Sequence, residues 1–191
     1  MSKNDFFETG KNTKNRIKKY YDLIEKNPNI FKPNSNPNDD EDFYLIGLHV
    51  LISDQIYLFL KALCKEKFEN YFKDPIIVNA KEFSDFNKFN TEISNACSFI
   101  DNNSKKHHPN EKNIENFLKF FDPDFKDKFF EYKIPREQPY TSFDAFNKIY
   151  ESRNCHVHGG ASGNKLGFKE LKKYEEGIYK FIDDVIAILN P

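Results

Sequence analysis

The sequence predicts an all-α protein, a helical bundle with a long central apolar helix and an irregular helical insertion. Apolar residues recur at spacings of three and four residues in the longest patterned segments, which is typical of amphipathic helices. Aromatic residues make up 16% of the chain, with 21 Phe, 10 Tyr and no Trp, which favours a core of large rings. Only the short run Ile76–Val78 has the composition of a strand, and a single strand cannot form a sheet.

The first predicted helix covers residues 11–25. Ile17, Tyr21 and Ile24 fall on one face of it, and basic residues occupy the other faces. Three prolines among Asn and Asp residues then predict a loop over residues 27–42.

The second predicted helix covers residues 43–72 and is apolar on nearly all sides up to residue 64. Such a helix is expected at the centre of a bundle, covered by its neighbours. Asp54 lies near its middle, where an ionisable residue would cost about 2.5–3.5 kcal/mol in a bilayer. The residues at the N-terminus also lack the apolar stretch of a secretory signal. We therefore expect a cytoplasmic protein that does not use a membrane, and we interpret His49 as a core histidine with its hydrogen bonds satisfied.

For the second half of the chain, the sequence predicts shorter helices and an irregular insertion. A third helix is expected over residues 84–100, followed by an irregular insertion over 101–140 with short helical pieces. Thr141 or Ser142 then caps a helix that runs to His158, and a last helix covers 168–189. Asp144, three residues after Thr141, completes the pattern of a capping box. We expect residues 1–191 to form one helical domain.

Charge and cysteine content narrow the classes of function. The formal net charge is −1, so no field over the whole molecule attracts nucleic acid, and any contact with RNA needs a local patch. Lys14, Arg16 and Lys18 on the first helix form the candidate patch for RNA, although a solvated helix face explains them as well. The three cysteines form no CxxC pair, which favours neither a zinc site nor a disulfide framework. We expect no metal and no cofactor.

The segment 151–160, ESRNCHVHGG, carries the residues with the most chemistry. Asn154 and His158 are four residues apart and therefore neighbours on one helix face. Arg153 is offset from that face, but its side chain is long enough to reach it. An arginine binds phosphate with a forked, permanently charged group, and a histidine exchanges protons near neutral pH. Together they suit RNA cleavage by attack of the ribose 2′-hydroxyl on the adjacent phosphate. In the plainer interpretation, the arginine pairs with an acid and the histidine only caps the helix.

This arrangement resembles the HEPN superfamily, whose motif is Arg-Asn, three residues, then His. Arg153, Asn154 and His158 match it, and the residues around 43–72 and 141–189 carry the wider resemblance. The resemblance implies an α-helical bundle, a homodimer formed through the motif-bearing helices, and a metal-independent endoribonuclease with Arg153 and His158 catalytic and Asn154 supporting them. It is similar to groups found in toxin–antitoxin and antiviral phage-defence systems, so an antitoxin or defence-system protein is a possible partner. Gly160 stands where members with a nucleotidyltransferase antitoxin often have Tyr, which weakens the case for that partner.

Two further residues are candidates for accessory roles. Asp54 could pair with Arg153 and orient it, or simply face solvent, and His156 lies within the motif segment but outside the motif spacing. Two alternatives to a nuclease stay open. One is a non-catalytic HEPN-like module that binds a partner protein or RNA, and the other is a helical scaffold in which Arg153 is buried against Asp54.

Overall fold

The computed structural model is helical in almost all of the residues it describes, as the sequence predicts. The structure describes residues 3–27, 41–73, 122–133, 139–158 and 166–189, together with Lys112, Ile114, Glu115, Leu118 and Lys119. The predicted helix at 84–100 and the run Ile76–Val78 lie outside the described residues. Within those residues the order is α1 (Lys3–Lys26), α2 (Glu41–Lys73), a 3₁₀ turn η1 (Phe125–Lys128), β1 (Glu131–Tyr132), β2 (Tyr140–Thr141), α6 (Ser142–His158), α7 (Phe168–Lys173) and α8 (Glu175–Leu189).

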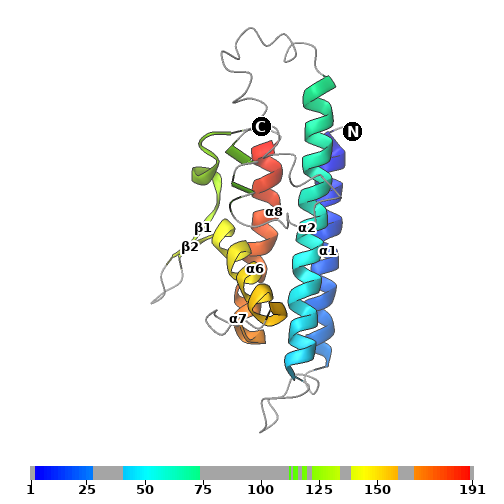
Figure 1. The fold of residues 1–191 in the computed structure, drawn as a ribbon, viewed down its shortest axis with the longest axis vertical. Coiled ribbons are helices and arrows are strands. Elements are labelled where there is room, and N and C mark those ends of the chain that lie inside the picture. The colour runs from blue at the N-terminus through cyan, green and yellow to red at the C-terminus, as the bar shows by residue number, and fades with distance from the viewer. Residues whose placement is uncertain are drawn as a thin grey trace.

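The helices form two groups that pack side by side. α1 and α2 run antiparallel as a long pair, and α8 runs alongside them with α6 crossing it (Figure 1). α2 lies between α1 and α6 and packs against both, while α8 packs against α1 and α6. The α1 stripe of Ile17, Tyr21 and Ile24 is buried, as the periodicity predicts.

The core between α6 and α8 is built from phenylalanine rings. Phe146 stacks on Phe181 with ring centroids 4.8 Å apart, and Phe129 stacks on the same ring at 5.8 Å. Phe143 packs against Phe129 at 5.0 Å. Such pairs contribute about 0.5–1.5 kcal/mol each beyond the area they bury. The expectation of a core of large rings is confirmed for this part of the molecule.

α2 differs from the expected central helix because it is not covered on all sides. Its inner face is buried through Ile52, Ile56 and Phe59, but Leu51 and Leu58 remain 44% and 53% exposed. Within the described part of the chain only α1 and α6 make extensive contact with α2, so two faces are covered and the outward one is not. By length and composition the stretch Leu45–Leu63 would suffice to cross a membrane, with 39% of it buried inside the structure. The core helix of a soluble protein can pass the same test, so one such stretch is weak evidence for a membrane span.

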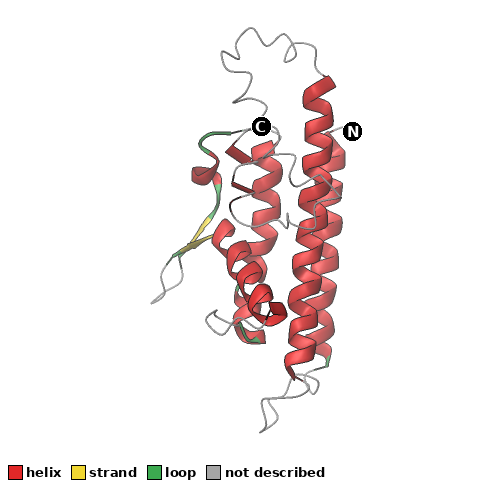
Figure 2. Ribbon diagram, in the orientation of Figure 1, coloured by secondary structure: helices red, strands yellow, loops and turns green. Residues whose placement is uncertain are grey.

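The short two-stranded ribbon and the break after α7 are corrections to the expected fold. Short helical pieces were expected within the insertion over 101–140, but after the helical turn η1 the residues Glu131 and Tyr132 are extended and pair antiparallel with Thr141 and Tyr140. Figure 2 shows the two short strands as the yellow pair. The stacked rings of Tyr132 and Tyr140, 5.0 Å apart, stabilise their pairing.

The helix expected over 168–189 is divided into α7 and α8 at Tyr174. There the backbone N–H of Tyr174 donates to the carbonyl of Leu171, three residues back, at 3.2 Å. This bond closes a tight 3₁₀-type turn in place of the regular α-helical bond. The first turn of α8 then continues with the N–H of Ile178 bonded to Tyr174 O at 2.9 Å.

The start of α6 is fixed by the predicted capping box. The backbone N–H of Thr141 donates to Asp144 Oδ2 at 2.7 Å, and the N–H of Asp144 donates to Thr141 Oγ1 at 3.1 Å. A second anchor is the buried carboxylate of Asp184 on α8, which accepts from Ser142 Oγ at 2.6 Å and from the N–H of Phe130 at 3.1 Å. These bonds set where α6 begins, and therefore where its far end lies.

Candidate functional site

The helical phase of α6 decides which motif residues face outward. Its buried stripe contains Phe146, Ile149 and Ser152, which pack toward α2 and α8. Arg153 follows Ile149 by four residues and Phe146 by seven, so it continues this stripe into the last turns of α6, and Asn154 is rotated about 100° away from it. Both side chains are half-buried, and Val157, on the last turn of α6, is 41% exposed. The end of α6 therefore presents its polar residues at the edge of the core.

Arg153 and Asn154 contact each other directly. Arg153 Nη1 donates to Asn154 Oδ1 at 3.1 Å. Among the described residues no carboxylate lies within ion-pair distance of Arg153, and the nearest acid along α6, Glu151, is paired with Lys148 at 3.8 Å. Within the described part of the chain, the guanidinium is thus oriented by an amide oxygen that does not neutralise its charge.

His158 is the last residue of α6, as the sequence predicts. Because α6 stays helical from Asn154 to His158, the two residues occupy neighbouring positions on one face, one turn apart. The side chains of His156 and His158 lie outside the described part of the structure. Arg153, Asn154 and the position of His158 are thus gathered within the last two turns of one helix.

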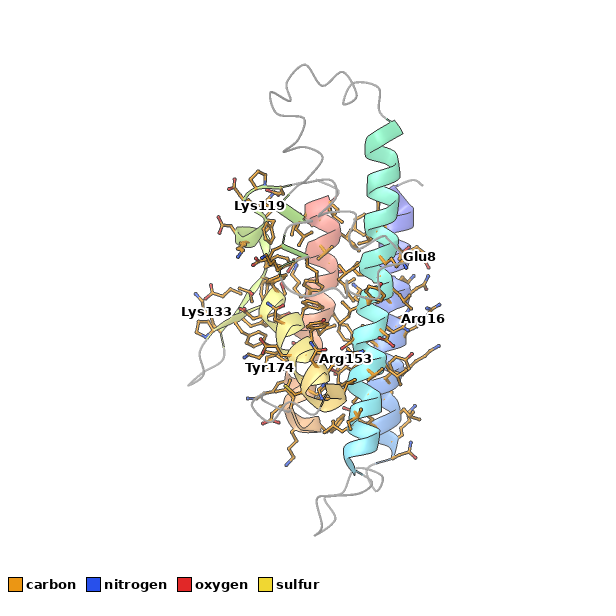
Figure 3. The ribbon with its side chains drawn as sticks, viewed as in Figure 1. Glu8, Arg16, Lys119, Lys133, Arg153 and Tyr174 are labelled. Carbon is orange, nitrogen blue, oxygen red and sulfur yellow. The ribbon has the colours of Figure 1, made fainter. Side chains whose placement is uncertain are left out.

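The other predicted site residues lie elsewhere. Asp54 is exposed on α2, and no ion pair joins it to Arg153. On α1, Lys14 is held by Asp183 at 2.5 Å, Arg16 donates to Gln55 Oε1 at 3.4 Å, and Lys18 is exposed. Figure 3 shows Arg16 across α2 from Arg153. The structure does not bring the α1 patch and the motif together in one protomer.

A buried polar cluster lies beside the motif. The sequence predicted that His49 is buried, but it did not reveal the other members of this cluster. His49 is fully buried, as predicted for a core histidine, and its Nε2 lies 3.1 Å from the carbonyl oxygen of Leu166. Ser152, also fully buried, accepts from the N–H of Leu166 at 2.8 Å. The available signal was the position of Ser152, since it falls three residues after Ile149 on the apolar stripe of α6.

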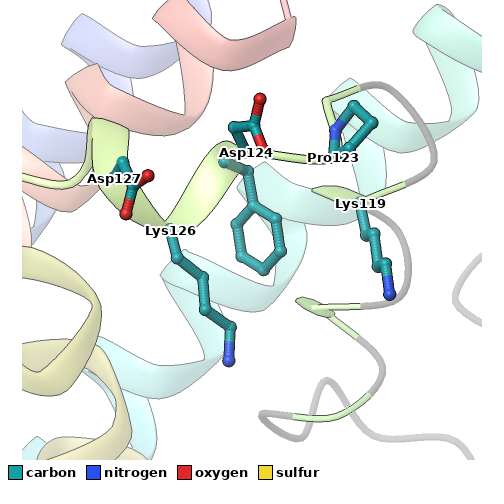
Figure 4. A pocket seen from close by; sticks show the side chains of 6 residues that line it. Lys119, Pro123, Asp124, Lys126 and Asp127 are labelled. Atoms are coloured by element: carbon teal, nitrogen blue, oxygen red, sulfur yellow. The ribbon is translucent and has the colours of Figure 1, made fainter.

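A hollow beside η1 does not contain the motif. It has a volume of about 280 Å³ and is lined by Lys119, Lys126, Asp124, Asp127, Pro123 and Phe125 (Figure 4). Lys126 is paired there with Glu115, and Lys119 lies at the rim. Within the described residues no group of three His, Cys, Asp or Glu side chains could hold a metal ion. The end of α6 remains the place where the chemistry-bearing residues of the described chain gather.

Comparison with known proteins identifies the family. The model of the RiboL-PSP-HEPN family matches residues 67–190 of the 191. The chain belongs to the RiboL-PSP-HEPN family. The match spans α6, α7 and α8 and includes Arg153, Asn154 and His158, which confirms the resemblance to the HEPN superfamily and the all-α fold that it implied. Most of α2, which also carried the predicted resemblance, lies before the match. No curated protein and no solved structure matches the chain.

Membership of a HEPN family suggests a role connected with RNA, of the kind that nucleases have. RNA is therefore the class of substrate that we consider for the end of α6.

Proposed function

We propose that this protein is a metal-independent endoribonuclease of the HEPN type, with its site at the end of α6 and completed in a homodimer. The observation that carries the proposal is the state of Arg153. Its guanidinium is half-buried, oriented by Asn154 at 3.1 Å and paired with no carboxylate among the described residues. A desolvated arginine in this state is suited to bind the phosphate that RNA cleavage must activate.

The proposed reaction uses the ribose of the substrate as the nucleophile. The 2′-oxygen attacks the adjacent phosphorus, its proton passes to a histidine, the bond from phosphorus to the 5′-oxygen breaks, and that oxygen takes up a proton. The products are a 2′,3′-cyclic phosphate and a 5′-hydroxyl. His158 exchanges the protons and Arg153 stabilises the negative charge that builds up on the phosphoryl oxygens.

A homodimer supplies what one protomer lacks. One histidine cannot act as base and acid in the same step, but two copies meeting at a twofold axis provide one for each role. The outer sector of α6, with Asn154, Val157 and the position of His158, is the surface that would face the second copy. The α1 residues Lys14, Arg16 and Lys18 would contact the RNA backbone away from the cleavage site, with Lys14 first releasing Asp183.

In the cell, we infer a toxin or antiviral defence effector in the cytoplasm, restrained by an antitoxin or defence-system partner. An unrestrained ribonuclease harms its host, and this supports a partner that controls it. Induced expression of the wild type should stop growth, while expression of Arg153→Ala should not.

The direct test is cleavage of single-stranded RNA by purified protein in excess EDTA. Wild type should cleave, and Arg153→Ala and His158→Ala should each lose at least about 10²-fold in kcat, the scale of one proton-transfer or charge-stabilising group. Arg16→Ala is the control for loss of a positive charge, and it should change KM rather than kcat. Equal cleavage by wild type and both motif variants would reject the proposal.

The second candidate is a non-catalytic HEPN module that binds RNA or a partner protein. The net charge of −1 and the pairing of Lys14 with Asp183 favour it, because both reduce the attraction for RNA as a substrate. RNA or partner binding by a wild type that does not cleave RNA and does not affect growth would support this candidate.

A further inference from the structure

Three distant parts of the chain meet in a buried polar junction beside the motif. We call it the His49 junction: His49 of α2, Ser152 of α6 and the backbone of Leu166, which precedes α7. His49 and Ser152 are fully buried, and Leu166 is 8% exposed. Nε2 of His49 lies 3.1 Å from Leu166 O and 3.4 Å from Ser152 Oγ, and the N–H of Leu166 lies 2.8 Å from Ser152 Oγ.

The direction of these hydrogen bonds follows from the chemistry of their acceptors. A carbonyl oxygen only accepts, so Nε2 of His49 carries a hydrogen and donates it to Leu166 O. Ser152 Oγ accepts from the N–H of Leu166. Both backbone polar groups of Leu166 are therefore satisfied by side chains from two different helices, in a place where water does not reach them.

Two residues of the junction, Ser152 and Leu166, flank the proposed site in the sequence. Ser152 directly precedes Arg153, and Leu166 is the first described residue after His158, the end of α6. Through His49 both are tied to α2, which also packs along α6. The turn of α6 that carries Arg153 is thus fixed to α2 and to Leu166, the first residue that the structure describes after α6.

An apolar residue would fill the position of His49 at a lower cost in desolvation. Burying an imidazole is unfavourable unless its polar atoms are bonded, and α2 is otherwise apolar around this residue, with Leu48 and Ile52 buried beside it. The polar group therefore has a local purpose, which is to hold Leu166 against Ser152.

We propose that His49 is a positioning residue for the catalytic pair, acting through Ser152 and Leu166 on the orientation of Arg153 and the end of α6. This inference rests on the proposed ribonuclease function. Replacement of His49 should let the last turns of α6 shift relative to α2 while the surface that binds RNA stays in place. A displacement of about 1 Å costs on the order of 10²-fold in rate when the reacting groups must be aligned.

The experiment compares four variants in steady-state RNA cleavage, with circular dichroism to confirm the helical fold. His49→Leu removes the donor, His49→Gln keeps an N–H donor on a side chain of similar reach, and Ser152→Ala removes the acceptor for Leu166. Ser53→Ala is the matched control, because Ser53 is, like Ser152, a buried serine, but it lies on α2 and its Oγ has no hydrogen-bond partner among the described residues.

The expected result is a split between kcat and KM. His49→Leu and Ser152→Ala should lower kcat by about 10²-fold with KM within a factor of about two, and His49→Gln should recover most of the loss. Ser53→Ala should behave as wild type. In hydrogen exchange, the amide of Leu166 should exchange faster in His49→Leu and Ser152→Ala than in wild type, whereas amides in the middle of α8 should not change.

Two outcomes separate a failure of this inference from a failure of the proposed function. If wild type cleaves, Arg153→Ala does not, and His49→Leu and Ser152→Ala cleave as well as wild type, the positioning role is wrong and the nuclease assignment stands. If wild type does not cleave RNA, the nuclease assignment is wrong and the positioning role falls with it. A loss of kcat in Ser53→Ala equal to that in Ser152→Ala would also overturn the inference, since it would reflect looser packing of the core.

Discussion

In the proposed reaction Arg153 binds the phosphate, and its charge and its shape make separable contributions. The bond from Nη1 to Asn154 Oδ1 uses one branch of the guanidinium and leaves the other donors for a phosphate. Arg153→Lys keeps the charge but loses the planar fork, so we expect kcat to fall by about 10–10²-fold, less than in Arg153→Ala. Steady-state cleavage of one RNA by the three proteins measures this order. An Arg153→Lys enzyme as active as wild type would show that charge alone suffices.

Tyr132 ties the β-ribbon to α8 in a way that depends on pH. Its hydroxyl donates to the carbonyl of Glu176 at 3.1 Å, and burial, followed by the nearby Tyr140, raises the pKa of Tyr132 to about 12. Because the pKa in the folded protein is above that of an unfolded tyrosine, about 10, the stabilisation is complete below pH 10 and is lost as the pH rises toward 12. Burial also raises the pKa of Tyr21 and of Tyr179, which adds to the same trend.

The measurement is urea unfolding of wild type and Tyr132→Phe between pH 8 and pH 12. Tyr132→Phe should be the less stable protein at pH 8, and the difference in unfolding free energy should shrink as the pH approaches 12. A difference that stays constant over this range would contradict the role of the hydroxyl.

Elements with periodic sequence were mostly predicted well, although α1 begins at Lys3 and not at residue 11, and those decided by contacts between distant residues were not. α2 and α6 begin and end within about two residues of their predicted limits, because apolar spacing and the Thr141–Asp144 capping box are local signals. At the β-ribbon and at the break after α7, three rings from separate elements meet: Tyr132 stacks on Tyr140 at 5.0 Å, and Tyr140 lies 5.2 Å from Tyr174. No local pattern in the sequence predicts that these three rings come together.

The candidate site shows the same division. Asn154 and His158 could be placed on one face of α6 because their spacing is local. The contact of Ser152 with His49, 103 residues earlier in the chain, depends on how α2 packs against α6 and had no local signal. Likewise, a pairing of Asp54 with Arg153 was plausible from residue types, but the rotation of α2 places Asp54 toward solvent.

The crossing of α6 and α8 depends on Gly177. A Cβ atom built there would lie 2.6 Å from the Cβ of Ala145, which cannot move without moving α6. Gly177→Ala should therefore destabilise the protein by about 1–3 kcal/mol, even after the gain in helix propensity. Gly10→Ala is the comparison, because the atom it would meet, Ile186 Cδ1 at 2.5 Å, is the end of a flexible side chain. We expect Gly10→Ala to stay within about 1 kcal/mol of wild type in urea unfolding. Equal stability of the two variants would contradict the close crossing.

For the whole molecule, the proposed dimer predicts which exposed apolar residue matters. Val157 lies on the outer sector of α6 at 41% exposure, and Leu23 on α1 is even more exposed at 62%. Val157→Asp should produce a monomer in sedimentation velocity and lose RNA cleavage, because a charge would be buried between the two copies. Leu23→Asp should remain a dimer and stay active. A Val157→Asp protein that is dimeric and active would place the interface elsewhere.

The central claim is that the end of α6 cleaves RNA by using the 2′-hydroxyl of the substrate. Analysis of the termini produced from an RNA oligonucleotide in EDTA, beside the same oligonucleotide with 2′-deoxyribose at the mapped cleavage position, tests it most directly. We predict a 2′,3′-cyclic phosphate and a 5′-hydroxyl from the RNA, no cleavage at the deoxy position, and neither product with Arg153→Ala. Cleavage at the deoxy position, or a 5′-phosphate on the product, would contradict the claim.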